Sequence, residues 1–230
     1  MDVLVIDIGG STIKVAVAKD GTQFDSSPDL RPEDLVKTVL GVAGDWQYDV
    51  ISIGFPGKVT AEGPAAEPGN LGTGWVGFDY EHALGKPVRV INDALMQAVG
   101  AYEGGRMLFL GLGTGVGSAL VTERVAVPLE LGDLPYRDSI LTDSLGRDAL
   151  ERDGLDRWRR TVLEVAPSLR RACLADYLVL GGGNAARVDP LPPDTRRGGN
   201  DDAIVGGTRL WREIVEPHDR QPSRFWRVMP

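Results

Sequence analysis

Two glycine-rich turns carry the residues whose chemistry is easiest to recognise. The first follows an apolar run and has the sequence DIGGS at residues 7–11, with Lys14 three residues further on. The second follows a similar run and has the sequence GLGTGVG at residues 111–117. Glycine lets backbone N–H groups approach an anion closely, because no Cβ intervenes. Two such turns that face each other would bind a chain of phosphates from both sides.

The side chains of these turns suit phosphate and a hydrated cation. The carboxylate of Asp7 could hold a hydrated Mg²⁺, and Ser11 and Lys14 offer a hydroxyl and a positive charge to phosphate. The second turn has Thr114 and no charged residue. Neither turn fits the P-loop or dinucleotide-binding patterns, because each strand is followed by a strand and not by a helix. For either turn alone, a purely structural role explains the glycines as well as phosphate binding does. The presence of two such turns favours phosphate binding.

Asp93 follows a predicted strand at residues 88–91, at the end where open α/β sheets place their ligands. A carboxylate there can take the proton of a substrate hydroxyl as general base. The alternative is that it caps the helix beginning at Ala94, with the help of Asn92.

Three further turns, at residues 54–57, 70–75 and 130–133, carry amide and carboxylate groups near tight bends. Such groups bind vicinal hydroxyls, so the set predicts a polyhydroxylated ligand with Trp75 nearby. The alternative is three ordinary surface turns.

Composition excludes several classes of protein. The chain has 230 residues, 42% of them hydrophobic, and a formal net charge of −8. The negative charge disfavours binding to nucleic acid or to an anionic membrane, which needs clustered Lys and Arg. Cys173 is the only cysteine, so no intramolecular disulfide and no cysteine-based zinc cluster can form. No apolar run approaches the roughly 20 residues of a membrane span, and we expect a cytoplasmic protein.

The hydrophobic pattern predicts a duplicated α/β arrangement with a cleft between two lobes. Paired strands are expected within residues 3–17 and 107–121, single strands at 22–24, 50–55, 88–91 and 177–180, and helices at 32–43, 95–102, 146–173 and 202–215. The first helix would bury Leu35, Val36, Val39, Leu40 and Ala43, and Pro167 would kink or split the third. Residues 56–86 and 128–144 are expected to be loop-like or irregular. We place the lobes at 1–93 and 94–215, with the last helix returning to the first lobe, and a loose tail at 216–230.

The motifs in their order resemble those of ROK-type sugar kinases. The matching motifs are Asp7-Ile8-Gly9-Gly10-Ser11, Gly54-x-Pro56-Gly57, Asn92-Asp93-Ala94, Gly113-Thr114-Gly115-x-Gly117, Glu130-x-Gly132 and Gly181-Gly182-Gly183. They extend over nearly the whole chain, to about Arg212. The resemblance implies the two-lobed actin-like (ribonuclease H-like) ATPase fold with a duplicated βββαβαβα core. The short length and the absence of a cysteine-rich zinc motif are most similar to polyphosphate glucokinases, as are residues 70–77, 104–112 and 177–184.

This resemblance implies phosphoryl transfer from polyphosphate, ATP or both to the 6-hydroxyl of glucose or a related hexose. Asp93 would be the general base and Asp7 would organise Mg²⁺. The donor phosphates would be bound by Gly9, Gly10, Ser11, Lys14, Gly113, Thr114, Gly115 and Gly117, and the remoter part of the donor by Gly181, Gly182, Gly183 and Asn184. The sugar would be bound by Gly57, Asn70, Asn92, Asp93, Glu130 and Asp133. The family is commonly dimeric, so a homodimer is expected.

Five arginines would also suit polyphosphate, although a solvated helix face explains them equally well. They are Arg147, Arg152, Arg157, Arg159 and Arg160.

Asp133 departs from the family pattern, which has Glu-x-Gly-His where this chain has Glu130-Leu131-Gly132-Asp133. A carboxylate accepts hydrogen bonds only, whereas histidine both donates and accepts. Two alternatives therefore stand beside a glucose kinase. One is a non-catalytic or weakly active sugar-binding protein, and the other is a kinase for another sugar, such as an acylamino sugar.

Overall fold

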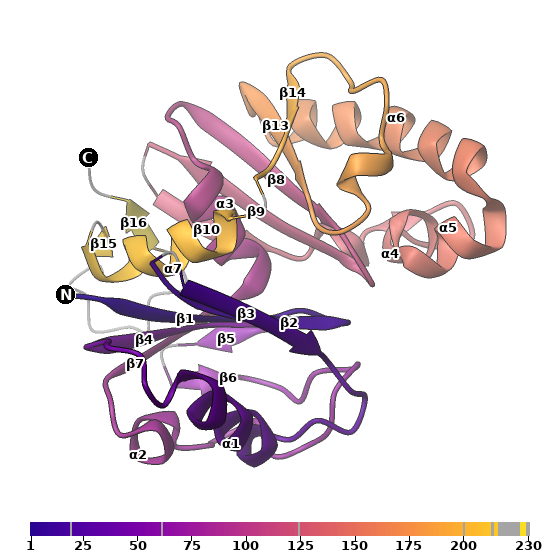
Figure 1. Cartoon of the computed structure of the whole chain (residues 1–230). Helices are drawn as coiled ribbons and strands as arrows, with labels where there is room; N and C mark the ends of the chain where they lie inside the picture. The colour runs from indigo at the N-terminus through magenta and orange to yellow at the C-terminus, as the bar shows by residue number, and fades with distance from the viewer. Residues whose placement is uncertain are drawn as a thin grey trace.

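Two large sheets of the same design form the core of the molecule (Figure 1). Two small two-stranded sheets consist of β5 (Val59–Thr60) with β6 (Gly63–Pro64) and of β11 (Pro135–Tyr136) with β12 (Ser139–Ile140). This computed structural model describes residues 1–18, 20–60, 62–123, 125–199 and 201–212, and the backbone of 214–215 and 226–228. The first sheet contains β1 (Val3–Ile8), β2 (Thr12–Val17), β3 (Asp20–Asp25), β4 (Val50–Phe55) and β7 (Val88–Asn92), in the order β3-β2-β1-β4-β7. The second contains β8 (Arg106–Leu112), β9 (Val116–Thr122), β10 (Val125–Leu129), β13 (Tyr177–Gly181) and β14 (Thr195–Arg197), in the order β14-β13-β8-β9-β10, and continues into β16 (Trp226–Val228) and β15 (Ile214–Val215).

The two sheets share one topology. In each, the first three strands form an antiparallel meander, and the fourth and fifth strands join in parallel beyond the first strand. Parallel pairing of this kind needs helical crossovers that cover the sheet faces. The duplicated α/β core predicted from the two hairpins is therefore confirmed.

Seven α-helices are assigned within the described residues. They are α1 (Pro32–Ala43), α2 (Tyr80–Leu84), α3 (Asp93–Ala101), α4 (Thr142–Leu145), α5 (Arg147–Asp153), α6 (Leu155–Ala172) and α7 (Asp202–Arg212). None of them is long and apolar enough to cross a bilayer.

The core consists of three layers of buried side chains, which follow from strand alternation. In β1, Leu4 and Ile6 pack with α1, whereas Val3 and Val5 face α3 and α7. In β8, Leu108 and Leu110 pack with α6, and Met107 and Phe109 join the central layer. Successive strand residues point to opposite faces, so each sheet supplies two layers. Helices α3 and α7 therefore lie between the sheets, as Figure 1 shows.

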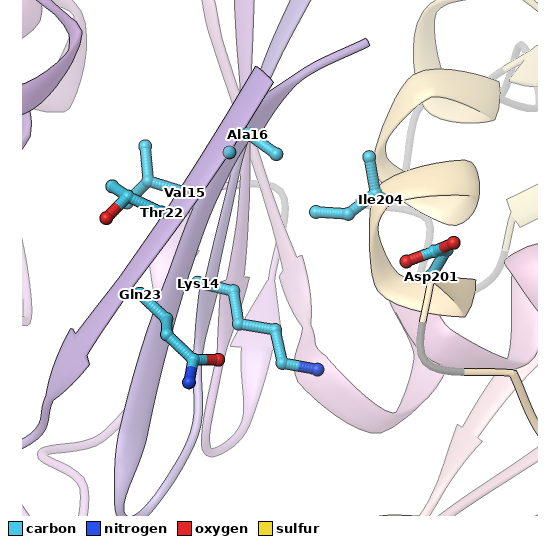
Figure 2. Close-up of a pocket in the computed structure, with 8 residues that line it drawn as sticks. Lys14, Val15, Ala16, Thr22, Gln23, Asp201 and Ile204 are labelled. Carbon is cyan, nitrogen blue, oxygen red and sulfur yellow. The ribbon is translucent and has the colours of Figure 1, made fainter. Parts of the chain in front are cut away.

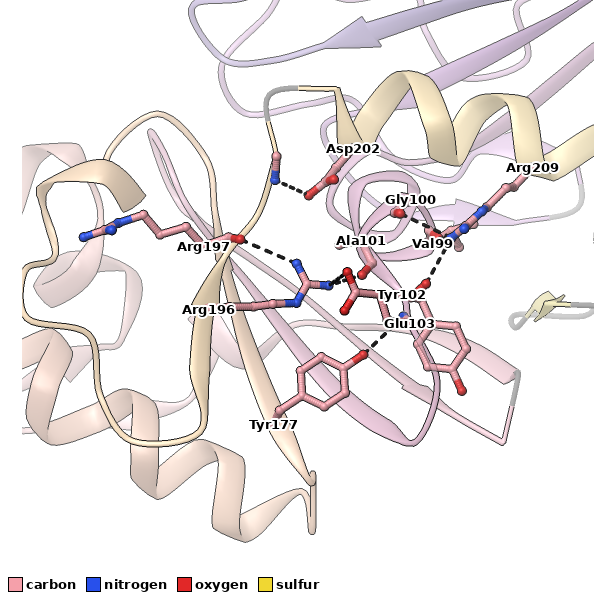
Figure 3. Close-up of polar contacts among 11 residues, drawn as sticks. Val99, Gly100, Ala101, Tyr102, Glu103, Tyr177, Arg196, Arg197, Asp202 and Arg209 are labelled. Carbon is pink, nitrogen blue, oxygen red and sulfur yellow. Dashed lines mark hydrogen bonds and ion pairs between the residues drawn. The ribbon is translucent and has the colours of Figure 1, made fainter. Parts of the chain in front are cut away.

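Two arginines hold the carboxyl end of α3 (Figure 3). Arg209 of α7 donates from Nη1 to the carbonyls of Val99 at 2.7 Å and of Gly100 and Tyr102 at 3.2 Å. Arg196 of β14 donates to the carbonyl of Ala101. The last carbonyls of a helix have no partner within the helix, and a cation there also favours the helix dipole. Helix α3, which begins at Asp93, is thus fixed at its far end by two other elements.

Several predicted boundaries are wrong, and local chemistry explains them. Residues 56–86 contain β5 (Val59–Thr60), β6 (Gly63–Pro64) and α2, which is too short to show a hydrophobic period. Asp79 caps α2, because its side chain accepts from the backbone N–H of His82 at 2.9 Å. Residues 128–144 likewise contain part of β10, the 3₁₀ turn η1 (Leu131–Asp133), β11 (Pro135–Tyr136), β12 (Ser139–Ile140) and most of α4.

The predicted helix at 146–173 is split, but not at Pro167. Helix α6 continues past Pro167, and the break falls at Gly154, whose φ of 78° lies in the left-handed region. Leu40 is 42% exposed and does not belong to the buried stripe of α1.

The predicted helix at 202–215 ends at Arg212 and is followed by β15. Of the predicted loose tail, residues 226–228 form β16, which pairs with β10 and β15. Residues 216–225 and 229–230 lie outside the described residues.

Candidate active site

The two glycine turns meet, together with the loop that carries Asn70. A Cβ placed on Gly10 would lie 2.6 Å from Thr114 Oγ1 and 2.9 Å from Asn70 Nδ2. A side chain at position 10 would force Thr114 or Asn70 to move, because a real Cβ does not approach other atoms so closely. A residue of each turn and a predicted sugar-binding amide are therefore brought together at one point.

Asp7 lies at the carboxyl end of β1 beside this point and is buried, with 6% of its surface exposed. Its Oδ1 atom has no hydrogen-bond partner. Burial raises the pKa of Asp7 to about 6, and the positive charge of Lys14 opposes that shift. Lys14 is the residue opposite Asp7 in the β1–β2 ladder. A buried carboxylate oxygen without a partner is costly unless a cation or a donor completes it.

Gly54 separates Asp7 from Asp93. It pairs with Asp7 across β1 and β4, and a Cβ there would lie 3.1 Å from Asp7 Oδ1 and 3.4 Å from Asp93 Cα. The carboxyl ends of β1, β4 and β7 thus lie side by side with a glycine in the middle, and the Cε methyl of Met96 fills the place of its missing side chain. This is the position at which parallel sheets bind ligands.

Asp93 is the first residue of α3 and has a pKa raised to about 7. Burial is the largest cause, and the negative charge of Asp7 adds to it. The backbone N–H groups of Asp93 and Ala94 oppose the shift, and Glu130 reinforces it slightly. A carboxylate with such a pKa is partly ionised near neutral pH, which suits a general base.

The residue that caps α3 is Asn92. Its Oδ1 accepts from the N–H of Leu95 at 2.9 Å, and its Nδ2 donates to the carbonyl of Gly57 at 3.1 Å. The capping role considered for Asp93 is therefore filled by its neighbour. Asn92 also joins the start of α3 to the Gly57 turn, so two of the predicted sugar-binding residues touch each other.

Glu130, just before the 3₁₀ turn η1, and Asp133, at its end, are both exposed. The backbone N–H of Asp133 donates to the carbonyl of Glu130 at 3.1 Å. Burial raises the pKa of Glu130, the charge of Asp133 raises it further, and Lys58 lowers it. Lys58, next to Gly57, was not identified from the sequence. Its effect places a positive charge from the first lobe near the acidic turn of the second.

Trp75 does not face a ligand. It is fully buried, its Nε1 donates to the carbonyl of Gly72 at 2.8 Å, and its ring packs against Phe55 with centroids 5.6 Å apart. The carboxylate of Glu67 accepts from the backbone N–H groups of Gly74 and Trp75. Trp75 therefore fixes the shape of the loop that carries Asn70.

The third glycine turn lies against the end of β8. Gly182 has a φ of 78°, and the N–H of Asn184 donates to the carbonyl of Leu112 at 2.9 Å. Leu112 leads directly into the second hairpin turn, so these two turns are neighbours. The space where a Cβ would stand is open at Gly113 and Gly183, whereas Ala94 fills it at Gly117 and Phe109 fills it at Gly181. Gly117 and Gly181 thus serve close packing.

Lys14 points into a cavity of about 520 Å³ between β2, β3 and the start of α7. Figure 2 shows its side chain extending toward the side of the cavity formed by Asp201 and Ile204, with Gln23 beside it. Ser11, Gly10 and Thr114 do not line this cavity. A donor that touches both Lys14 and the meeting point of the turns would therefore have to extend from one to the other.

The five arginines considered for polyphosphate separate into two groups. Arg147 lies at the hairpin turns, with its Nη2 2.5 Å from Ser11 Oγ. Arg152 pairs with Asp153 at 3.0 Å, and Arg159 donates to the carbonyl of Arg187 at 3.0 Å. Arg157 and Arg160 are exposed on α6. A solvated helix face accounts for the arginines other than Arg147.

The residues at the turns suit a magnesium ion shared with phosphates. Within the part of the chain that the structure describes, no three His, Cys, Asp or Glu side chains form a metal cluster. Mg²⁺ is commonly held by one or two carboxylates together with water and substrate phosphates. The unpartnered Oδ1 of Asp7 fits that pattern.

The chain is similar in sequence to known polyphosphate glucokinases. No family model matches the chain. It is 23% identical to polyphosphate glucokinase of Mycobacterium tuberculosis over 212 residues, which cover 82% of this chain and 80% of the relative. It is 24% identical to polyphosphate glucokinase of Mycobacterium leprae over 214 residues, which cover 82% of this chain and 65% of the relative.

Solved structures have the same fold. The inorganic polyphosphate/ATP-glucomannokinase of Arthrobacter sp. strain KM superposes with a TM-score of 0.77 at 24% identity, over 90% of this chain and 96% of that one. A ROK family glucokinase of Streptomyces griseus, in complex with glucose and AMPPNP, superposes with a TM-score of 0.74 at 15% identity, over 91% of this chain and 99% of that one. The predicted two-lobed fold and the predicted resemblance are both confirmed.

Proposed function

We propose that this chain, which has the fold of the ROK-family sugar kinases, transfers a phosphoryl group from polyphosphate, ATP or both to the 6-hydroxyl of glucose or a related hexose. The observation that carries the proposal is the position of Asp93. This carboxylate, with a pKa of about 7, follows β7 beside Asp7 and Gly54, and its neighbour Ala94 packs against Gly117 of the second turn. A base and an anion site side by side are what phosphoryl transfer to an alcohol requires.

In the proposed reaction Asp93 accepts the proton of the sugar hydroxyl while the hydroxyl oxygen attacks the terminal phosphorus of the donor. The new O–P bond forms while the bond from that phosphorus to the bridging oxygen breaks, and the electron pair leaves on that oxygen. Gly10, Ser11 and Thr114 hold the donor phosphates in line, which removes much of the entropic part of the barrier. Asn70 and Glu130 bind hydroxyls of the sugar ring.

Asp7 would hold Mg²⁺ at its unpartnered oxygen. The ion, when bound, neutralises charge on the donor phosphates. A homodimer, expected from the family resemblance, and a cytoplasmic location, expected from the sequence, belong to the same proposal.

A coupled assay tests the proposal. Glucose is supplied with Mg²⁺ and either ATP or polyphosphate, and glucose 6-phosphate is measured through its oxidation by a dehydrogenase. We expect product with at least one donor. Absence of product with both donors, while glucose still binds in calorimetry, would instead support the sugar-binding protein without catalysis. Mannose and N-acetylated hexosamines in the same assay test the kinase for another sugar.

Activity is expected to depend on pH through Asp93. A general base must be ionised, so kcat/KM for the sugar should fall as the pH drops through about 7, the pKa of Asp93. Asp7, with a pKa of about 6, should steepen the fall at lower pH. The measurement is a kcat/KM profile between pH 5 and pH 9, with the melting temperature recorded at each pH to exclude unfolding. A flat profile from pH 6 to pH 8 would contradict the role of Asp93.

Replacing Lys14 should affect the donor more than the sugar. Lys14→Ala removes a cation that lies beside Asp7 on the donor side. We expect KM for the donor to rise by roughly tenfold, as for the loss of one charge-assisted contact, with KM for the sugar nearly constant. Lys37→Ala, at an exposed position of α1, is the matched control. An effect confined to the sugar would reverse the assignment of the first hairpin.

A further inference from the structure

Arg147 contacts both hairpin turns at once. Its guanidinium Nη2 lies 2.5 Å from Ser11 Oγ of the first turn. Its backbone N–H donates to the carbonyl of Thr114 in the second turn, at 3.3 Å. The two turns belong to different sheets, so this residue joins the halves of the molecule at the point where phosphate is expected.

The backbone before Arg147 is packed tightly against the second turn. A Cβ on Gly146 would lie 2.7 Å from the carbonyl oxygen of Thr114 and 2.8 Å from that of Thr142. The N–H of Gly146 also donates to the Thr142 carbonyl at 2.9 Å. A larger residue at 146 would separate α5 from the second turn. The backbone of Arg147 is thus held beside the second turn, and its partly buried side chain differs from a solvated surface arginine.

The charge of Arg147 is not neutralised by a neighbouring carboxylate. It takes part in no ion pair with a described residue. In contrast, Arg152 of the same helix pairs with Asp153. A guanidinium has five N–H donors, and the side-chain hydrogen bond to Ser11 uses one of them. The remaining donors suit an anion with several oxygens.

We propose that Arg147 binds the phosphoryl donor directly, through non-bridging oxygens of the phosphate held between the two turns. This inference rests on the proposed function and extends it, because it adds a residue to the donor site. A planar guanidinium can make two parallel hydrogen bonds to a phosphate. In the proposed transfer the charge spreads over the equatorial oxygens of the moving group, and a cation there lowers the barrier. Ser11 orients the guanidinium for this contact.

The test uses inorganic tripolyphosphate as a probe that needs no turnover. Calorimetry measures its binding to the wild type, Arg147→Met and Arg147→Lys, with Arg152→Met as the matched loss of a cation on the same helix. For Arg147→Met we expect the Kd to rise about 10- to 100-fold, as when a charge-assisted hydrogen bond is lost. The Kd of Arg147→Lys should lie between those of Arg147→Met and the wild type, and the Kd of Arg152→Met should equal that of the wild type. Glucose binding, measured on every variant, confirms that the sugar site is folded.

Steady-state kinetics and a double variant with Ser11→Ala complete the test. Arg147→Met should lower kcat/KM for the donor and leave the Kd for glucose unchanged. In a Ser11→Ala background the loss caused by Arg147→Met should persist. If it vanishes there, Arg147 acts only through Ser11, and direct binding is overturned.

Unchanged tripolyphosphate affinity in Arg147→Met also overturns the inference, whatever the activity of the enzyme. The proposed function can fail separately. If the wild type transfers no phosphate to any hexose but binds tripolyphosphate through Arg147, the anion contact is supported and the kinase is not.

Discussion

Asp93→Asn is expected to fold normally and to lose nearly all phosphoryl transfer. General-base assistance is worth about 10²–10⁴ in rate, and asparagine cannot accept the proton of a sugar hydroxyl. The substitution preserves size, and the capping of α3 is supplied by Asn92, so the helix keeps its first hydrogen bond. The kcat of the purified variant would be measured with each donor, and glucose affinity by calorimetry. We expect kcat to fall and glucose affinity to be retained.

A matched substitution separates catalysis from helix capping. Asp79→Asn removes a carboxylate at the start of α2, where the side chain caps the helix outside the site. Asparagine caps as well as aspartate, so this variant should keep its activity and its melting temperature. Near-wild-type turnover in Asp93→Asn would mean that the Asp93 carboxylate serves α3 and not the substrate.

The sequence predicted the duplicated core because its signals are local. Each hairpin has two strand-length apolar runs around a glycine turn, and both halves repeat that pattern before a parallel strand. Such periods follow from the geometry of the strand itself. The predictions failed where short elements depend on side-chain caps or on packing, as at α2 and at the break before α6. Those features occupy too few residues to produce a period.

The candidate site was predicted in composition but not in geometry. The motif series identified Asp7, Asp93 and the two turns, and the structure brings them together through Gly54 and Gly10. The sequence could not separate Arg147 from the other four arginines, since all five lie in one helical, charged stretch. The distinguishing signal was Gly146, whose lack of a side chain lets α5 approach Thr114. The burial of Trp75 was equally hidden, because it depends on packing against Phe55, twenty residues earlier in the chain.

Asp133 is the position at which the chain departs most clearly from the ROK-type motif pattern that it resembles. The turn that carries it is docked on the second hairpin, since a Cβ on Gly132 would lie 2.5 Å from Thr142 Oγ1 and 2.9 Å from the carbonyl of Val116. Asp133 itself is exposed, and its charge raises the pKa of Glu130. Two neighbouring carboxylates accept hydrogen bonds but donate none when ionised. A sugar at this turn must therefore supply the donors.

Asp133→His is expected to strengthen glucose binding by roughly 1–3 kcal/mol, the gain when a polar ligand regains a matched partner. The imidazole supplies a donor, and loss of the Asp133 charge removes the repulsion that raises the pKa of Glu130. Asp133→Asn is the control, because it removes the charge without adding the ring. Affinity would be measured by calorimetry and turnover by the coupled assay.

Tighter binding and faster turnover with histidine alone would mean that the native protein is a weakened glucokinase or prefers another sugar. No change in either variant would mean that Asp133 faces solvent and does not touch the sugar. Weaker binding with histidine would contradict the expectation and assign the carboxylate as an adapted contact, made to a substrate that presents a hydrogen-bond donor at that position.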